Sequence, residues 1–383
     1  MIYLDNSATT QPFSEVLQTF QDASMQYFGN PSSLHSAGMN AEQLLTKART
    51  ATAKLFSIDP KEVVYTSGGT EGNNLAIKGT ALEHVSRGRH LITSQVEHPS
   101  VLEAFEQLEN AGFEVTYLPV DASGRVSPKE VQHSLRKDTT LVSIMHVNNE
   151  IGTVQPVEEI ADILQHVPHT YFHVDHVQGV GKVSLDFAHP GIDLCTVSGH
   201  KVHAVKGTGF LYVRQGVSLS PLFHGGKQEQ SLRSGTENVP GIAALAKALR
   251  MSLERSDELD RLEGLKRRLM FAFQEMPGAV VNTPDDASAP HIFNVAFPGV
   301  KPEVVIQSLA KKGIHVSTKS ACASKLQQAS PVLLALGRDV ETATSAIRVS
   351  LCFDTTEEEI DQLLKALHEC LPEFLEVMGA KNA

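Results

Sequence analysis

Tryptophan is absent from this sequence of 383 residues, and cysteine occurs only four times, at positions 195, 322, 352 and 370. The cysteines form no CxxC pair and have no histidine at metal-ligand spacing, so we expect neither a disulfide framework nor a metal site. No apolar run is long enough to cross a bilayer. The start, MIYLDNSATT, lacks a basic region followed by an apolar one, so no secretory signal is expected. These absences predict a soluble, cytoplasmic protein without a membrane partner.

A concentration of positive charge is also missing. Lysine and arginine number 33 against 44 acidic residues, the formal net charge is -11, and the basic residues are scattered. Nucleic-acid binding needs a clustered basic face, so we expect no direct contact with nucleic acid. The other composition values, 41% hydrophobic and 20% charged, are ordinary for a globular protein. The length exceeds the size at which single cores stop growing and predicts two domains.

Short apolar segments alternate with helical stretches over most of the chain, which predicts an α/β domain with a mostly parallel sheet. The apolar segments are VVYTS, HLITSQ, EVTYLPV, TLVSIMHV, YFHVD and DLCTVSG. The charged stretch 244–276 is predicted to be a long helical stretch that leads to a smaller α+β domain. We therefore expect a large domain over residues 14–260 and a small domain over residues 1–13 and 261–383.

Polar residues follow these strands, at the sheet edge where α/β proteins bind ligands. In VVYTSGGTEGNN, the glycine turn and helix start at Gly69, Thr70 and Glu71 predict a phosphate cradle, a weak signal on its own because such turns are common. His98 follows the next strand and starts a helix at Pro99.

Three further strands end in candidate residues. Asn149 follows one, Asp175 and Gln178 end and follow the second, and Ser198, His200 and Lys201 end and follow the third. Each could be a surface residue if taken singly. Together a lysine amine, a strand-end carboxylate, a histidine and a phosphate cradle match the needs of pyridoxal phosphate.

Near the C-terminal end, STKSACASKLQQAS places Cys322 among polar and small residues. The segment has neither a helical apolar stripe nor strand alternation, so it is predicted to be an exposed, mobile loop. The neighbouring Lys319 and Lys325 would favour the Cys322 thiolate. A tolerated surface cysteine is the plainer interpretation of this segment alone.

Motifs in order along essentially the whole chain carry a resemblance to a known family. They are YLDNSATT, NPSSLHSAG, TSGGTEGNN, EH at 97–98, VNNEIGTVQP, HVDHVQ, SGHK, LRSGTENV, SACAS and AIRVSL. The sequence resembles cysteine desulfurases of the nitrogen-fixation and iron-sulfur-assembly type, which are fold-type I pyridoxal-phosphate enzymes of the class V aminotransferase family. The resemblance implies a mostly parallel seven-stranded sheet in the large domain and a small domain that carries the cysteine loop.

The resemblance also implies roles for individual residues. Lys201 would form the Schiff base, Asp175 would pair with the pyridine nitrogen, Gln178 would bond the phenolic oxygen, and His98 would stack on the ring and move protons. The phosphate contacts implied are Thr70, Ser198 and His200, with Thr236 from the neighbouring subunit of a homodimer. Asn149 and Arg348 would hold the carboxylate of L-cysteine, and Cys322 would accept the sulfur.

The implied reaction converts L-cysteine to L-alanine and leaves a persulfide on Cys322, which passes the sulfur to an acceptor protein for iron-sulfur clusters or for thiolation of transfer RNA or cofactors. An aminotransferase, a selenocysteine lyase and a sulfur carrier with a decayed cofactor site are the alternatives. The sequence departs from the family at His176, Lys227, Lys319 and Cys352, none of which is a principal catalytic position.

Overall fold

The structure, a computed structural model, describes residues 1–318 and 329–377. Its largest feature is a seven-stranded sheet with the strand order β2-β8-β7-β6-β5-β3-β4. The strands are β2 (Val63–Thr66), β3 (His90–Ser94), β4 (Glu114–Leu118), β5 (Thr139–Met145), β6 (Tyr171–Asp175), β7 (Leu194–Ser198) and β8 (Gly209–Val213). β8 runs antiparallel to both of its neighbours, β2 and β7, and the other neighbouring pairs in this sheet are parallel. The prediction of a mostly parallel seven-stranded sheet is confirmed.

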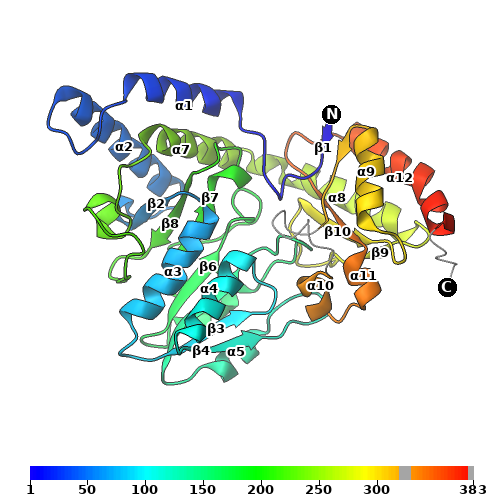
Figure 1. Ribbon diagram of the computed structural model, residues 1–383, viewed down its shortest axis with the longest axis horizontal. Coiled ribbons are helices and arrows are strands. Elements are labelled where there is room, and N and C mark those ends of the chain that lie inside the picture. Colours follow the sequence, from blue (N-terminus) through cyan, green and yellow to red (C-terminus); the bar gives the residue numbers. More distant parts are fainter. Residues whose placement is uncertain (319–328, 378–383) are drawn as a thin grey trace.

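Helices cover this sheet, as the apolar sequences of its strands require. Every residue of β3, β5 and β7 is buried, which is typical of parallel strands covered on both faces. The helices of this part are α1 (Ser14–Gln26), α2 (Ser36–Leu55), α3 (Gly69–Glu83), α4 (Pro99–Asn110), α5 (Pro128–Ser134), α6 (Val157–Leu164) and α7 (Val239–Leu253). In Figure 1, α3 and α4 lie in front of the sheet and α1, α2 and α7 pack together above it.

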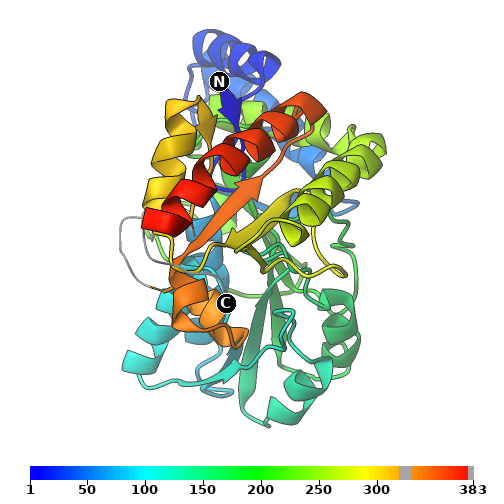
Figure 2. The ribbon, with the colours of Figure 1, turned by 90° about the vertical axis from the view of Figure 1, so that its right-hand side faces the viewer.

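A second group of elements lies beside the first and contains both ends of the described chain. Its antiparallel sheet has the order β12-β10-β9, and a short parallel pair joins β1 to β11. The strands are β1 (Ile2–Tyr3), β9 (Val280–Val281), β10 (Ile292–Ala296), β11 (Ile314–His315) and β12 (Ala346–Ser350); the helices are α8 (Leu259–Gln274), α9 (Pro302–Lys311), α10 (Pro331–Ala335), α11 (Val340–Thr344) and α12 (Glu357–Val377). Figure 2 shows α12 and α9 side by side over β12.

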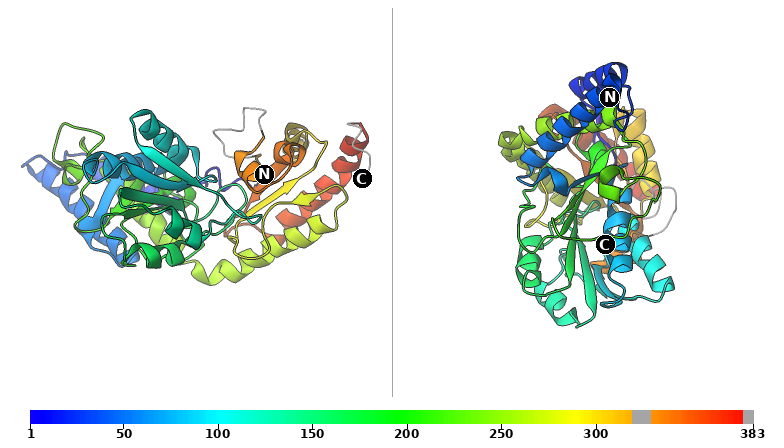
Figure 3. Two further views of the ribbon diagram at one scale, coloured as in Figure 1. Left: turned by 90° about the horizontal axis from the view of Figure 1, so that it is seen from below. Right: turned by 90° about the vertical axis from the view of Figure 1, so that its left-hand side faces the viewer.

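Two hydrophobic cores correspond to these two groups. The larger core takes its buried residues from between Val16 and Leu249, and the second core combines Ile2 and Leu4 with residues from Leu262 to Leu371. The view from below in Figure 3 shows the two groups as separate lobes. This separation supports a large domain over 14–260 and a small domain over 1–13 and 261–383, whose boundaries stay a prediction.

The stretch 244–276, predicted to be a long helical connection, is helical but consists of two helices. The chain leaves α7 at Leu253 and enters α8 at Leu259, with a short 3₁₀ turn at 256–258 between them. Arg255 stabilises the break because it pairs with Glu258 and with Asp354 of the small domain, at 2.6 and 2.7 Å. The helical periodicity on both sides of the break gave no sign of this break, which tertiary ion pairs stabilise.

Candidate active site

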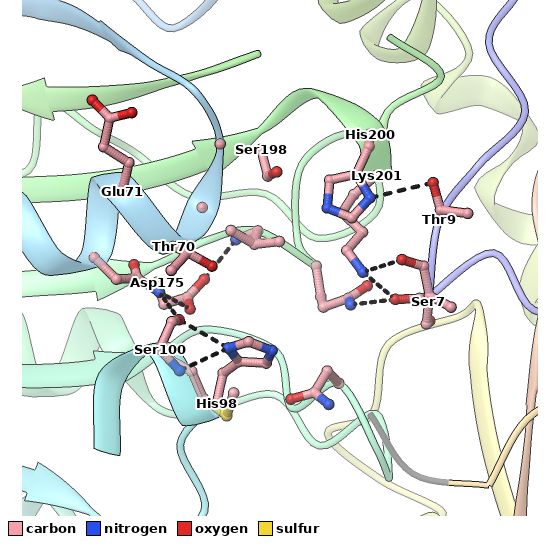
Figure 4. Close-up of a pocket in the computed structure, with 18 of the residues that line it drawn as sticks. Ser7, Thr9, Thr70, Glu71, His98, Ser100, Asp175, Ser198, His200 and Lys201 are labelled. Atoms are coloured by element: carbon pink, nitrogen blue, oxygen red, sulfur yellow. Dashed lines mark hydrogen bonds between the residues drawn. The ribbon is translucent and has the colours of Figure 1, made fainter. Parts of the chain in front are cut away.

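The carboxyl ends of β2, β3, β5, β6 and β7 meet at one edge of the sheet and line a cavity of about 540 Å³. Besides Glu71, ten of the residues predicted from the sequence line this cavity: Gly69, Thr70, His98, Asn149, Asp175, Gln178, Ser198, His200, Lys201 and Arg348. Figure 4 shows several of them pointing toward a common space. The cavity therefore lies beyond the carboxyl ends of parallel strands, where α/β sheets generally bind their ligands.

One end of the cavity is formed by the start of α3. Gly68, which precedes the helix, has φ 149° and provides no side-chain cap, so the first N–H groups of α3 have no capping acceptor from that residue. A Cβ at Gly69 would lie 2.9 Å from Val177 Cγ2, so only glycine fits there without displacement. The buried Ser198 Oγ lines the same end and has no hydrogen-bond partner among the described residues. These groups form an unsatisfied donor site suited to an anion.

Glu71, which the sequence grouped with this cradle, has another task. Its carboxylate accepts hydrogen bonds from the Arg233 side chain and the Ser67 backbone, both at 2.9 Å. Figure 4 shows the side chain directed away from the other site residues. Bonding to Arg233 and Ser67 overcomes the effect of burial and lowers the pKa of Glu71. The carboxylate therefore pairs with a cation and leaves the anion site to the helix N–H groups.

Asp175 ends β6 and is held as a hydrogen-bond acceptor beneath the cavity. Its two carboxylate oxygens accept from Asn73 Nδ2 at 2.8 Å and from the Val177 backbone at 3.0 Å. Asn73 lies on α3 and also donates to Ser100 Oγ at 2.9 Å. The carboxylate is thus fixed in orientation by two neighbouring elements, as a buried acid must be to remain in place.

His98 is the N-cap of α4, and this role fixes its ring. The backbone N–H of Ser100 donates to His98 Nδ1 at 3.1 Å, so Nδ1 is an acceptor and the proton of the neutral ring is on Nε2. Burial lowers the pKa of His98, which favours this neutral form. Figure 4 shows one ring nitrogen of His98 turned toward Ser100 and the other on the side of the ring away from Ser100.

Lys201 lies in the 3₁₀ turn after β7 and reaches the N-terminal segment. Its Nζ donates to the carbonyl oxygens of Ser7 and Ala8, the second at 2.8 Å. Gln178 Nε2 donates to the same Ser7 oxygen at 3.0 Å. The neighbouring His200 ring lies 3.3 Å from Thr9 Oγ1, and burial beside Lys201 lowers its pKa to about 4. Residues 7–9 therefore complete the cavity beside the lysine.

Residues 7–9 were missed as site residues by sequence reasoning, although the motif YLDNSATT was noticed. The backbone carbonyls of Ser7 and Ala8 make the contacts with Lys201, and carbonyl groups carry no residue-type signal. The polar run after the first short strand was the available clue.

Arg348 enters the cavity from β12 of the small domain and is almost wholly buried. Its Nη1 donates to the Asn149 carbonyl at 2.7 Å, and its Nη2 lies 3.1 Å from Asp5 Oδ1 and 2.9 Å from Ser317 Oγ. Its Nε has no partner among the described residues. A buried guanidinium with a vacant donor beside a cavity is suited to a carboxylate ligand.

One described site residue predicted from the sequence, Thr236, does not line this cavity. Thr236 lines a smaller neighbouring cavity of about 200 Å³ that shares Ser67 and Gly207 with the larger one. Cys322 lies outside the described residues, as does Lys319. Of the other departures, His176 is buried with its Nδ1 2.8 Å from His146 Nδ1, and Lys227 is exposed before the 228–231 turn.

The family model described as "Aminotransferase class-V" matches residues 2–363. This chain belongs to the aminotransferase class-V family. Within the family it is 45% identical to a NifS/IcsS protein homolog of Lactobacillus delbrueckii subsp. bulgaricus, over 98% of this chain and 99% of that protein. It is 41% identical to the cysteine desulfurase IscS of Dictyoglomus turgidum, over 100% of this chain and 97% of that protein.

Solved structures of class-V relatives share the fold. A NifS-like protein superposes with a TM-score of 0.91 at 39% identity, covering 97% of this chain and 99% of that one. SspA in complex with cysteine superposes with a TM-score of 0.80 at 34% identity, covering 92% and 99%. The predicted family and fold class are thus confirmed. Within the described part of the chain, no helix has the length and apolarity to cross a membrane, and no cluster of three metal-ligating side chains occurs.

Proposed function

We propose that this class-V protein is a pyridoxal-phosphate-dependent cysteine desulfurase. The observation that carries the proposal is the convergence of the Lys201 amine, the Asp175 carboxylate and an anion site in one cavity. The relatives named as cysteine desulfurases match this chain over nearly its full length, which supports the same reaction here.

The residues present fit pyridoxal phosphate. The uncapped start of α3 and the unpartnered Ser198 hydroxyl suit its phosphate, and Thr70 and His200 line the same cavity. Asp175 is held with its oxygens available to a protonated ring nitrogen, and Gln178 lies beside Lys201. When bound, the cofactor supplies an electron sink for the carbon atoms of the amino-acid substrate.

Three side chains bind the substrate and move protons. Arg348, with its vacant Nε, holds the carboxylate of L-cysteine next to Asn149. Lys201 Nζ removes and returns the proton at the substrate Cα, for which the Ser7 and Ala8 carbonyls hold the amine in position. His98 supplies or accepts a proton at Nε2, because its Nδ1 is committed to the helix cap.

The sulfur transfer needs no external oxidant. The thiolate sulfur of Cys322 forms a bond to the substrate sulfur while the bond between that sulfur and the substrate Cβ breaks. The electron pair of the broken bond stays on Cβ, which takes a proton, so the products are L-alanine and a Cys322 persulfide. Reductant or an acceptor protein then removes the outer sulfur.

We also propose the assembly and setting that the family implies. The protein acts as a cytoplasmic homodimer in which Thr236 contacts the cofactor of the other subunit, and it delivers sulfur to an acceptor for iron-sulfur clusters or for thiolation of transfer RNA or cofactors. The position of Thr236 in the adjoining small cavity, away from the ten other residues, supports a role across a subunit boundary.

The test is alanine formation from L-cysteine in the presence of a thiol reductant. Wild type is compared with Cys322→Ser at equal cofactor loading, and we expect alanine from the wild type and almost none from the variant. Equal alanine from both would mean that Cys322 is not the acceptor. Wild-type turnover only with a keto acid, and without sulfide, would identify an aminotransferase instead.

A further inference from the structure

The chain segments on both sides of Cys322 are anchored to two consecutive residues, Asn149 and Glu150. On the C-terminal side, Ser330 Oγ donates to Glu150 Oε2 at 2.5 Å. On the N-terminal side, Ser317 and Arg348 exchange backbone hydrogen bonds at 3.2 and 2.6 Å. Arg348 in turn donates to the Asn149 carbonyl at 2.7 Å. The two ends of the stretch that contains Cys322 are therefore tied to one turn of the cavity wall.

This turn is itself fixed to both domains. Asn148 Oδ1 accepts the N–H groups of Glu150 and Ile151 at 2.9 and 3.0 Å, and its Nδ2 donates to the Val96 carbonyl of the large domain at 2.9 Å. Asn294, on β10 of the small domain, donates to the Glu150 carbonyl at 3.2 Å. Glu150 thus belongs to a turn that hydrogen bonds hold to both domains, and the cavity-lining Asn149 lies on the same turn.

The side-chain hydroxyl of Ser330 connects this turn to the small domain. The hydroxyl donates to Glu150 and accepts the Leu333 N–H, so it also caps α10. The Ser330 backbone donates to the Ala343 carbonyl at 3.0 Å, which holds the residue against α11. Both Ser330 and Glu150 are buried. A carboxylate in this setting costs desolvation energy that an apolar contact would avoid, which points to a task other than packing.

We propose that Glu150 is a positioning residue for sulfur transfer, which acts by holding Ser330 and so fixing the C-terminal end of the Cys322 segment on the turn that lines the substrate cavity. The inference rests on the proposed desulfurase function and deepens it. A group on a chain fixed at both ends samples less volume than one on a chain fixed at one end, so its effective concentration at the substrate sulfur is higher. Neither Glu150 nor Ser330 lines the cavity.

The experiment separates the step that needs Cys322 from the steps that precede it. In rapid-mixing measurements on the cofactor-loaded enzyme, the absorbance change that cysteine causes reports binding and proton transfer at Cα. Persulfide on Cys322, trapped by alkylation and measured by mass spectrometry, reports sulfur transfer. In Ser330→Ala and Glu150→Ala we expect persulfide formation to slow by about tenfold while the absorbance change stays within about twofold of wild type.

Conservative variants serve as matched controls. Ser330→Thr keeps the hydroxyl and Glu150→Gln keeps an acceptor oxygen, so both should restore persulfide formation to within about threefold of wild type. The double variant of Ser330→Ala and Glu150→Ala should be no slower than either single variant, because the two residues act through one contact. An unchanged cofactor absorbance band verifies that each variant is folded.

Three results would overturn the inference: no slowing of persulfide formation, equal slowing of both steps, or additive losses in the double variant. If the Ala variants do not fold, Glu150→Asp takes their place, because the shorter side chain withdraws the carboxylate from Ser330 Oγ; the same selective slowing of persulfide formation is then expected, and its absence would overturn the inference. Wild-type enzyme that processes cysteine but forms no persulfide on Cys322 would instead refute the proposed function.

Discussion

The cavity wall that belongs to the seven-stranded sheet is assembled from compact strand-turn units, whereas the wall that faces it combines segments far apart in the sequence. On the sheet side, Asp175 ends β6, and Lys201 follows β7 by three residues. On the other side, Asp5, Ser317 and Arg348 meet at one guanidinium. Parallel strands bring successive turns to one edge without further specification, but the second wall exists only after the N-terminal segment and residue 317 have packed onto β12.

The two walls also treat buried charge differently. The guanidinium of Arg348 is paired with Asp5 across segments 343 residues apart. Next to His98 of the sheet wall, the buried Glu97 has no cationic partner among the described residues, and burial raises its pKa to about 8, so it is protonated at neutral pH. From this comparison we expect that residues of the sheet wall can be altered one at a time. Changes to the facing wall around Arg348, here called the substrate wall, also affect the hydrogen bond from Arg348 to Asn149 of the large domain.

The largest effect is expected from Lys201→Ala in the sheet wall. Without the amine, both the lysine-linked absorbance of the cofactor and the proton transfer at Cα are lost, so alanine formation should fall by between about 10² and 10⁴. The measurement is alanine formation together with the absorbance spectrum. Lys206→Ala is the matched control, since Lys206 also lines the cavity but is exposed. An equal loss in that control would contradict the assignment of Lys201.

The sequence predicted the sheet wall of this site more fully than the wall around Arg348. At each strand end named from the sequence, at least one of the named residues lines the cavity, because a strand followed by Gly-Gly or Glu-His places side chains at a known edge. Arg348 was found through its resemblance to a family position, and its partners Asp5 and Ser317 were not found. Their contact depends on docking of the N-terminal segment and of residue 317 onto β12, and no local pattern encodes that docking.

Arg348→Lys tests the substrate wall and should have the next largest effect. A lysine amine cannot keep the bonds to Asn149, Asp5 and Ser317 and also bind a carboxylate, so kcat/KM for cysteine should fall by an amount equivalent to about 2–5 kcal/mol. Cofactor affinity should stay near the wild-type value. Arg214→Lys is the control, because Arg214 pairs with Asp193 elsewhere, at 3.3 Å. An equal loss of cofactor affinity would break the distinction between the walls.

Glu97→Gln tests how the sheet wall keeps a buried acid neutral, and its effect should be the smallest of the three. Glu97 Oε1 accepts from Ser94 Oγ at 2.6 Å and from the Met145 backbone at 3.1 Å, which an amide oxygen can also do. Because the folded pKa of about 8 lies above the usual carboxyl pKa of 4.5, the folded state holds a proton that the unfolded state releases. This stabilisation is complete below the unfolded pKa and is lost as the pH rises through the folded pKa.

The loss amounts to about 1.4 kcal/mol for each pH unit inside that window. The free energy of unfolding in urea, measured near about pH 6 and about pH 8, should therefore fall by about 2 kcal/mol more in wild type than in Glu97→Gln. Glu103→Gln, on the exposed face of α4, should leave the wild-type dependence unchanged. Parallel curves for wild type and Glu97→Gln would mean that Glu97 is ionised in the folded protein. The sheet wall would then hold its buried charge as the substrate wall does, through partners, and that difference between the two walls would disappear.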